Sequence, residues 1–158
     1  MTRQEALQKL WQRLFLVLAA MLSLAIGVLA IGGDSRTGVL IFLLGNIGGY
    51  VGVHKSLADL KDDEVIQLSA SWWAILAPSL VGGILAEILY ILFLSNLVAG
   101  DIFPKFKPDN TAQEGLGSLM AQHAVDMPAY AKLFFWAFLA GFNQKYAVDI
   151  LNSVRAKP

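Results

Sequence analysis

Apolar residues are concentrated in four long runs, and short polar stretches separate them. The runs cover about residues 14–31, 38–53, 74–98 and 129–150. The hydrocarbon core of a bilayer is about 30 Å thick, and a helix needs roughly 20 predominantly apolar residues to cross it. The pattern therefore predicts an all-α membrane protein, a four-helix transmembrane bundle that forms a single domain over residues 1–158.

The four runs differ in the strength of this signal. The third run is the longest, and Trp72 and Trp73 before it are typical of a membrane interface. The second run is short, with about 24 Å of helix. The fourth run is strongly apolar only over residues 131–142, about 18 Å of helix. A re-entrant or surface helix therefore stays open there as the alternative to a crossing.

Local signals indicate where the first and third helices begin. Thr2 followed by Glu5 fits a capping box, which predicts a helix that starts near Arg3 and continues into the first run. The basic front end also resembles a secretory signal, but the apolar stretch is longer than a usual signal core, so we expect an uncleaved anchor. Pro78 either lies in the first turn of its helix, where the missing amide hydrogen is not needed, or kinks the helix as a gating hinge, and we favour the first turn.

The two longer connections are polar. Residues 54–71 and 100–127 are each expected to hold a short amphipathic segment, because apolar positions recur at helical spacing near 57–66 and 112–125. Pro128 then suits the first turn of the last helix.

Composition supports the membrane interpretation and excludes several other classes. Hydrophobic residues make up 56% of the chain and charged residues 15%, whereas soluble domains have about 45–50% and about 25%. The formal net charge is zero and no basic block is present, so nucleic acid is not expected as a partner. The chain has no Cys, which excludes disulfides and thiolate metal sites. No nucleophile–base pair or His-rich set falls within the runs, so we expect no enzyme, no cofactor and no metal.

The basic residues predict the orientation of the bundle. If the N-terminus is cytoplasmic and four helices cross, eight basic residues lie inside and four outside, as the positive-inside rule requires. This predicts an N-in/C-in topology. The inner residues are Arg3, Lys9, Arg13, Lys55, Lys61, Lys145, Arg155 and Lys157, and the outer ones are Arg36, Lys105, Lys107 and Lys132.

Glu87 is the most informative residue in the chain. It lies near the middle of the third run, where a carboxylate costs roughly 2.5–3.5 kcal/mol on insertion scales. This cost disfavours a lipid-facing position. A carboxylate buried without a positive partner favours uptake of a proton, so one interpretation is a proton or cation path. The other is a carboxyl group that only joins two helices by hydrogen bonds.

Two further polar residues accompany Glu87. Tyr90 shares its helical stripe and can donate a hydrogen bond. Asn46 lies in the middle of the second run, where it is either a pore ligand or, as we favour, an interhelical hydrogen-bonding group. A direct bond between Asn46 and Glu87 is a third possibility, and it would make both structural.

Small residues recur four positions apart, a spacing that lets helix backbones approach closely. A chain this small has little interior, so we expect a homo-oligomer. The packing candidates are Gly45, Gly48, Gly49, Gly52 and Gly83, with Ala19, Ser23, Gly27, Ser79, Ala137 and Gly141 at the same spacing.

Other polar and aromatic residues have simpler interpretations. His54 and His123 are expected in loops on opposite sides, so they do not share a metal. The acidic residues between 59 and 64 lack calcium-loop spacing and are expected on a solvated helix face. The aromatic residues of the last run almost surround its helix, which favours a lipid-facing surface: Phe134, Phe135, Trp136, Phe138 and Phe142.

Two functions stay open. The first is a homo-oligomeric channel or pore in the lipid bilayer, with Glu87 and Asn46 facing a hydrated path. The second is a non-catalytic membrane scaffold or sensor subunit that docks a soluble or membrane protein partner through residues 55–71 or the C-terminal tail. In size and four-span layout the chain resembles small bacterial inner-membrane proteins such as holin-like pore formers and membrane subunits of defence or secretion systems. This resemblance implies a bacterial inner-membrane location and transfers no residues.

Overall fold

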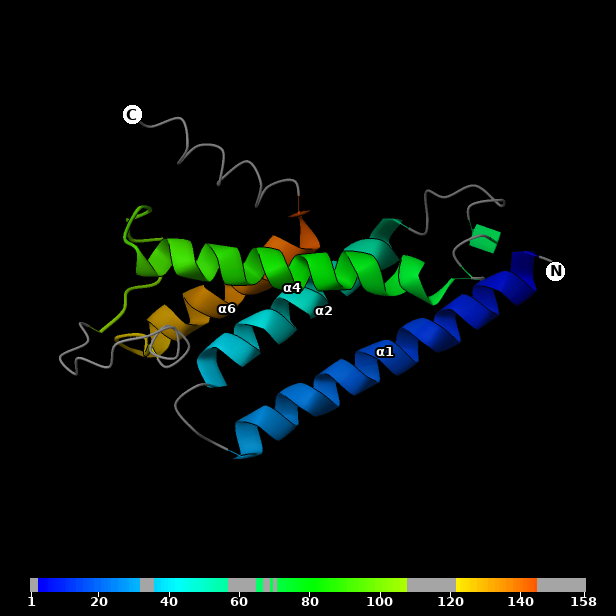
Figure 1. Ribbon diagram of the computed structural model, residues 1–158, viewed down its shortest axis with the longest axis horizontal. Coiled ribbons are helices and arrows are strands. Elements are labelled where there is room, and N and C mark those ends of the chain that lie inside the picture. Colours follow the sequence, from blue (N-terminus) through cyan, green and yellow to red (C-terminus); the bar gives the residue numbers. More distant parts are fainter. Residues whose placement is uncertain are drawn as a thin grey trace.

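In the part of the chain that the structure describes, four helices run roughly side by side (Figure 1). The computed structural model describes residues 3–31, 36–56, 65–66, 69, 71–107 and 122–144. Three of the helices are long and apolar enough to cross a membrane, and α6 is a shorter apolar helix. The expected all-helical fold is therefore confirmed for the described residues. The helices are α1 (Arg3–Ile31), α2 (Arg36–Ser56), α4 (Trp72–Leu94) and α6 (Met127–Phe142).

The helix ends differ from the expected spans at two places. The third helix ends at Leu94 instead of near residue 98, because the chain turns at Ser95 and Asn96 has a positive φ of 54°. The last helix ends at Phe142, with Asn143 as its C-cap, whereas the apolar run was drawn to about residue 150. The segment from 145 onward lies outside the described residues.

Pro78 does not lie in a first turn, so that prediction is wrong. Trp72 and Trp73 already belong to α4, and Pro78 is inside the helix. Its carbonyl oxygen accepts a hydrogen bond from Gln144 Nε2 at 2.7 Å. This bond connects α4 to the chain just after α6, and α4 continues as a helix through the proline.

Helices α2, α4 and α6 form a core in which backbones touch. A Cβ added at Gly45 would lie 2.5 Å from the Gly82 carbonyl oxygen and 2.9 Å from Gly83 Cα. A Cβ at Gly49 would lie 2.6 Å from the Pro78 carbonyl oxygen. Gly48 and Gly52 approach α6 at Phe138 and Phe142 in the same manner. The absence of side chains at these positions is what allows the three helices to pack so closely.

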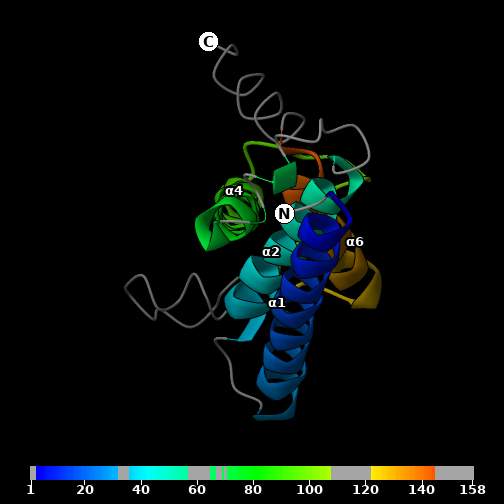
Figure 2. The same cartoon turned by 90° about the vertical axis from the view of Figure 1, so that its right-hand side faces the viewer.

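Helix α1 is packed much less tightly. Leu10 and Leu14 pack against Tyr50 of α2. Beyond Met21 the large apolar side chains of α1 are exposed, and a Cβ at Gly27 would meet nothing within 4 Å. The small-residue spacing around Gly27 therefore has no neighbour among the described residues. Figure 2 shows α2 in the middle of the bundle, and it contacts the other three helices.

The helices alternate in direction, so two ends of the bundle can be distinguished. At the first, here called the Trp11 end, the Trp11 and His54 rings lie 4.5 Å apart edge to face, and the Arg13 guanidinium lies 4.7 Å from the Trp72 ring centroid. His54 belongs to the last turn of α2, so its expected loop position is wrong. Lys55 lies over the Phe142 ring at 5.5 Å.

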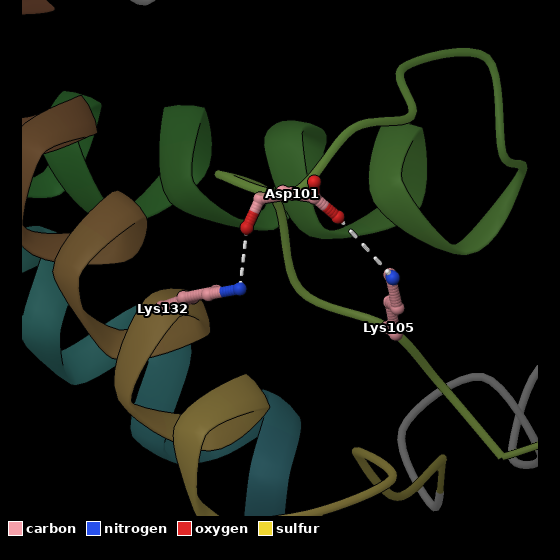
Figure 3. A network of polar contacts seen from close by, with 3 residues as sticks. All are labelled: Asp101, Lys105 and Lys132. Carbon is pink, nitrogen blue, oxygen red and sulfur yellow. Dashed lines mark hydrogen bonds and ion pairs between the residues drawn. The ribbon is translucent and has the colours of Figure 1, made fainter.

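The opposite end, here called the Asp101 end, joins α4 to α6. Lys132 donates to the Asp101 carbonyl oxygen, and Lys105 lies 3.5 Å from the Asp101 carboxylate (Figure 3). Trp136 is buried and its Nε1 donates to the Ile102 carbonyl oxygen at 3.0 Å. The expected lipid-facing position of Trp136 is therefore wrong, because its indole N–H finds a partner inside the bundle.

Several expectations fall on other parts of the chain. Thr2, residues 57–64 and residues 108–121 lie outside the described residues, and so does the C-terminal tail. Most of the expected docking surfaces and amphipathic segments fall on these residues. Residues 122–125 are described, and the expectation of a helix there is wrong. Ala124 instead forms an isolated antiparallel bridge with Phe106.

Candidate functional site

Glu87 lies at the border between the buried and exposed faces of α4. Ala86 and Tyr90 are each 1% exposed, whereas Ile84 and Ile88 are 54% and 40% exposed. The backbone of Phe42 in α2 makes a polar contact with the Glu87 carboxyl group. Its second oxygen, Oε2, is buried and has no hydrogen-bond partner among the described residues. Buried polar atoms are nearly always paired, so this one calls for an explanation.

No positive charge compensates Glu87 within the described part of the bundle core. The basic residues of α2, α4 and α6 that the structure describes are Arg36, Lys55 and Lys132. Lys55 and Lys132 are engaged at opposite ends of the bundle, and Arg36 is the first residue of α2. A carboxyl group in this setting can exchange a proton or attract a cation, and it has no salt bridge to neutralise it.

Asn46 belongs to the packing of α2 against α4. It is 2% exposed, and its Nδ2 donates to the Phe42 carbonyl oxygen at 2.8 Å. The Ser79 hydroxyl donates to the Asn46 carbonyl oxygen at 2.7 Å and lies 3.5 Å from its Oδ1. Asn46 therefore joins the two helices through Ser79, and the alternative in which it binds Glu87 is not what the structure shows.

Tyr90 lies one turn from Glu87 toward the Asp101 end. It is 1% exposed, and its hydroxyl is close enough to both Glu87 and Tyr130 to interact with them electrostatically. Its ring meets the Phe106 ring edge to face, with centroids 5.8 Å apart. Tyr90 therefore connects the carboxyl group with the loops that cover this end of the bundle.

Tyr130 and His123 extend this polar set to the surface. The Tyr130 hydroxyl lies 3.1 Å from His123 Nδ1, which is a hydrogen bond whose direction depends on the ring tautomer. Both side chains are partly exposed. Sequence reasoning did not single out Tyr130, and it treated His123 as an ordinary loop residue. Their pairing depends on the path of residues 123–126, just before α6, and this segment has no recognisable sequence motif.

A short clasp of backbone hydrogen bonds holds His123 over the bundle. The Lys107 amide donates to the His123 carbonyl oxygen, and the Val125 amide donates to the Lys105 carbonyl oxygen, each at 3.0 Å. Asp126 then caps α6 by accepting a hydrogen bond from the Ala129 amide at 2.8 Å. The clasp, residues 105–107 and 123–125, therefore fixes His123 relative to the first turn of α6.

Among the described residues, no His, Asp and Glu side chains form a group of three or more that could hold a metal ion. A scan against protein-family models, a search of curated proteins and a search of solved structures each returned no match.

Proposed function

We propose that this chain is an integral membrane protein that conducts protons or small cations across a bilayer as a homo-oligomeric channel, with Glu87 as the group that binds the ion. The proposed location is the bacterial inner membrane. The observation that carries the proposal is the buried, unpaired Oε2 of Glu87 in the middle of an apolar helix. An ionisable group in such a segment is costly, and the usual reason for its presence is an ion or proton pathway.

The packing of the core supports an oligomer rather than a pore within one chain. Gly45, Gly82 and Gly141 bring α2, α4 and α6 into backbone contact, which leaves no space for an ion along the axis of these three helices. Glu87 lies instead at the rim of α4, beside the exposed apolar residues Ile84 and Ile88. A path past Glu87 therefore has to be completed by a second copy of the chain.

The surroundings of Glu87 favour a proton over a metal cation. A dehydrated Ca²⁺ takes six to eight oxygen ligands, and Mg²⁺ takes six. The other acidic residues that the structure describes are Glu5, Asp101 and Asp126, and none of them belongs to α2, α4 or α6. A single carboxyl group is sufficient to take up and release a proton. We therefore expect proton conduction to be the main activity.

Proton flux in liposomes tests this proposal. The purified chain is reconstituted in vesicles with a pH-sensitive dye inside, and a potassium gradient with valinomycin drives proton entry. We expect flux from the wild-type chain and its loss in Glu87→Gln, because the amide keeps the shape of the side chain and cannot carry a proton. Glu5→Gln, the same change at an exposed carboxylate of α1, is the matched control. Equal flux in the wild type and Glu87→Gln would refute the role of Glu87.

A further inference from the structure

A buried carboxyl group conducts only if protons reach it, and the two directions away from Glu87 differ. Toward the Trp11 end, the nearest polar side chain on the buried face of α4 is Ser79, whose hydroxyl is already bonded to Asn46. Toward the Asp101 end lie Tyr90, Tyr130 and His123, each with a group that both donates and accepts protons. Among the described residues, the groups nearest to Glu87 that can exchange protons are therefore on the Asp101 side, and the Tyr50–His54 pair lies at the far Trp11 end.

These groups also form a gradient of burial from the surface to Glu87. His123 and Tyr130 are partly exposed, and Tyr90 is 1% exposed. The Phe106 ring lies against Tyr90 from the loop side, and the clasp fixes that loop to His123. Because the Phe106 ring lies against Tyr90, the hydroxyl groups of Tyr90 and Tyr130 are the polar groups that lead from the surface toward Glu87 at this end of the bundle.

We propose that His123, Tyr130 and Tyr90 form a relay that carries protons between the solution at the Asp101 end and Glu87. This inference rests on the proposed function, since it assigns an entrance to the same site. Water protonates the free ring nitrogen of His123, and the ring releases the proton on Nδ1 to the Tyr130 oxygen at 3.1 Å. Tyr130 gives up its own hydroxyl proton toward Tyr90, directly or through a bridging water, and Tyr90 passes its proton to the Glu87 carboxylate. Glu87 gains one proton, the solution loses one, and the three relay residues keep their proton count.

The relay makes conduction depend on the pH at the Asp101 end. His is the side chain that ordinarily changes charge near neutral pH. The titratable groups around His123 are Tyr130 from α6, Lys105 and Lys107 from the facing segment, and Asp126 at the start of α6. Lys105 is exposed, and Asp126 is held by its capping bond. Replacement of His123 is therefore expected to change the pH profile of the flux.

The test uses the same liposomes with variants at both ends of the bundle. Tyr130→Phe and His123→Gln each remove a relay group, and we expect each to slow proton flux roughly tenfold or more. The matched controls are Tyr50→Phe and His54→Gln, because Tyr50 and His54 form a tyrosine–histidine pair at the Trp11 end. These controls are expected to conduct like the wild type. His123→Gln should also flatten the dependence of flux on the pH at the Asp101 end, which a purely structural role would not do.

The outcomes separate the relay from the proposed function. If Glu87→Gln abolishes flux while Tyr130→Phe and His123→Gln conduct like the two controls, the relay is wrong and the role of Glu87 stands. If Glu87→Gln conducts like the wild type, or the wild type does not conduct, both proposals fail. His123 is partly exposed, so His123→Gln tests the relay even if Tyr130→Phe does not fold.

Discussion

Gly82 is the position where a single methyl group should disturb the bundle most clearly. A Cβ at this residue would lie 2.5 Å from the Gly45 carbonyl oxygen, 2.9 Å from Gly141 Cα and 3.2 Å from Gly49 Cα. Ordinary van der Waals contacts of a Cβ begin at 3.4 Å, so the shortest of these falls 0.9 Å short. All three neighbours are backbone atoms, and they belong to α2 and α6. Neither helix can therefore yield by rotating a side chain.

We expect Gly82→Ala to destabilise the bundle by about 3 kcal/mol, the upper end of the usual cost of overpacking. Helices α2 and α6 both have to move away from α4, and close packing is the main interaction that holds membrane helices together. Gly27→Ala is the matched control, because nothing lies within 4 Å of its added Cβ. Alanine favours a helix over glycine by about 0.5–1 kcal/mol, so this variant should be neutral or slightly more stable.

Unfolding in a titration with a denaturing detergent measures both variants. Tryptophan fluorescence is a suitable signal, since Trp136 is buried and stacks on Phe103 with ring centroids 5.3 Å apart. We expect the transition of Gly82→Ala at a clearly lower detergent fraction than that of Gly27→Ala. If the unfolding free energy of Gly82→Ala lies within about 0.5 kcal/mol of the wild type, the close contact of the three backbones is not how the bundle packs.

Two smaller effects can be measured in the same titration. Ser79→Ala removes the hydroxyl that donates to the Asn46 carbonyl oxygen at 2.7 Å. It should lower the unfolding free energy by about 0.6 kcal/mol, the average for hydrogen bonds between membrane helices. A loss of stability as large as that of Gly82→Ala would contradict this. Asp126→Ala removes the N-cap of α6 and should cost about 1 kcal/mol, whereas Asp126→Asn, which can still cap the helix, should retain most of that stability.

The positions of the helices follow largely from the chain itself. The length of an apolar run, compared with the thickness of a bilayer, is a local property that needs no knowledge of neighbours. Capping residues and prolines are local too, and Asp126 with Pro128 at the start of α6 is an example. Pro78 shows the limit of this reasoning. A proline within an apolar run is compatible with a first turn or a helix interior, and the bond to its carbonyl comes from Gln144, which lies 66 positions further along the chain.

The orientation of α4 about its own axis shows a different limit. Ile84, Ile88 and Ile91 are exposed while Leu89 and Phe93 are buried, so both faces of the helix are apolar and no polar face indicates which one is inside. For the same reason Gly83 was singled out from its spacing and the neighbouring Gly82 was not, although both meet other helices.

The sequence by itself therefore determined that the chain forms apolar helices and that one of them carries a carboxyl group, Glu87, near its middle. Only the tertiary structure decided what surrounds that carboxyl group. It placed Asn46 with Ser79 rather than with Glu87, and it brought His123 to Tyr130 through backbone bonds between segments that precede α6. The physical reason is that an apolar run indicates which environment a helix lies in. Polar contacts between helices depend instead on how each helix is rotated about its axis and how closely the helices approach, and both are set only when the helices pack.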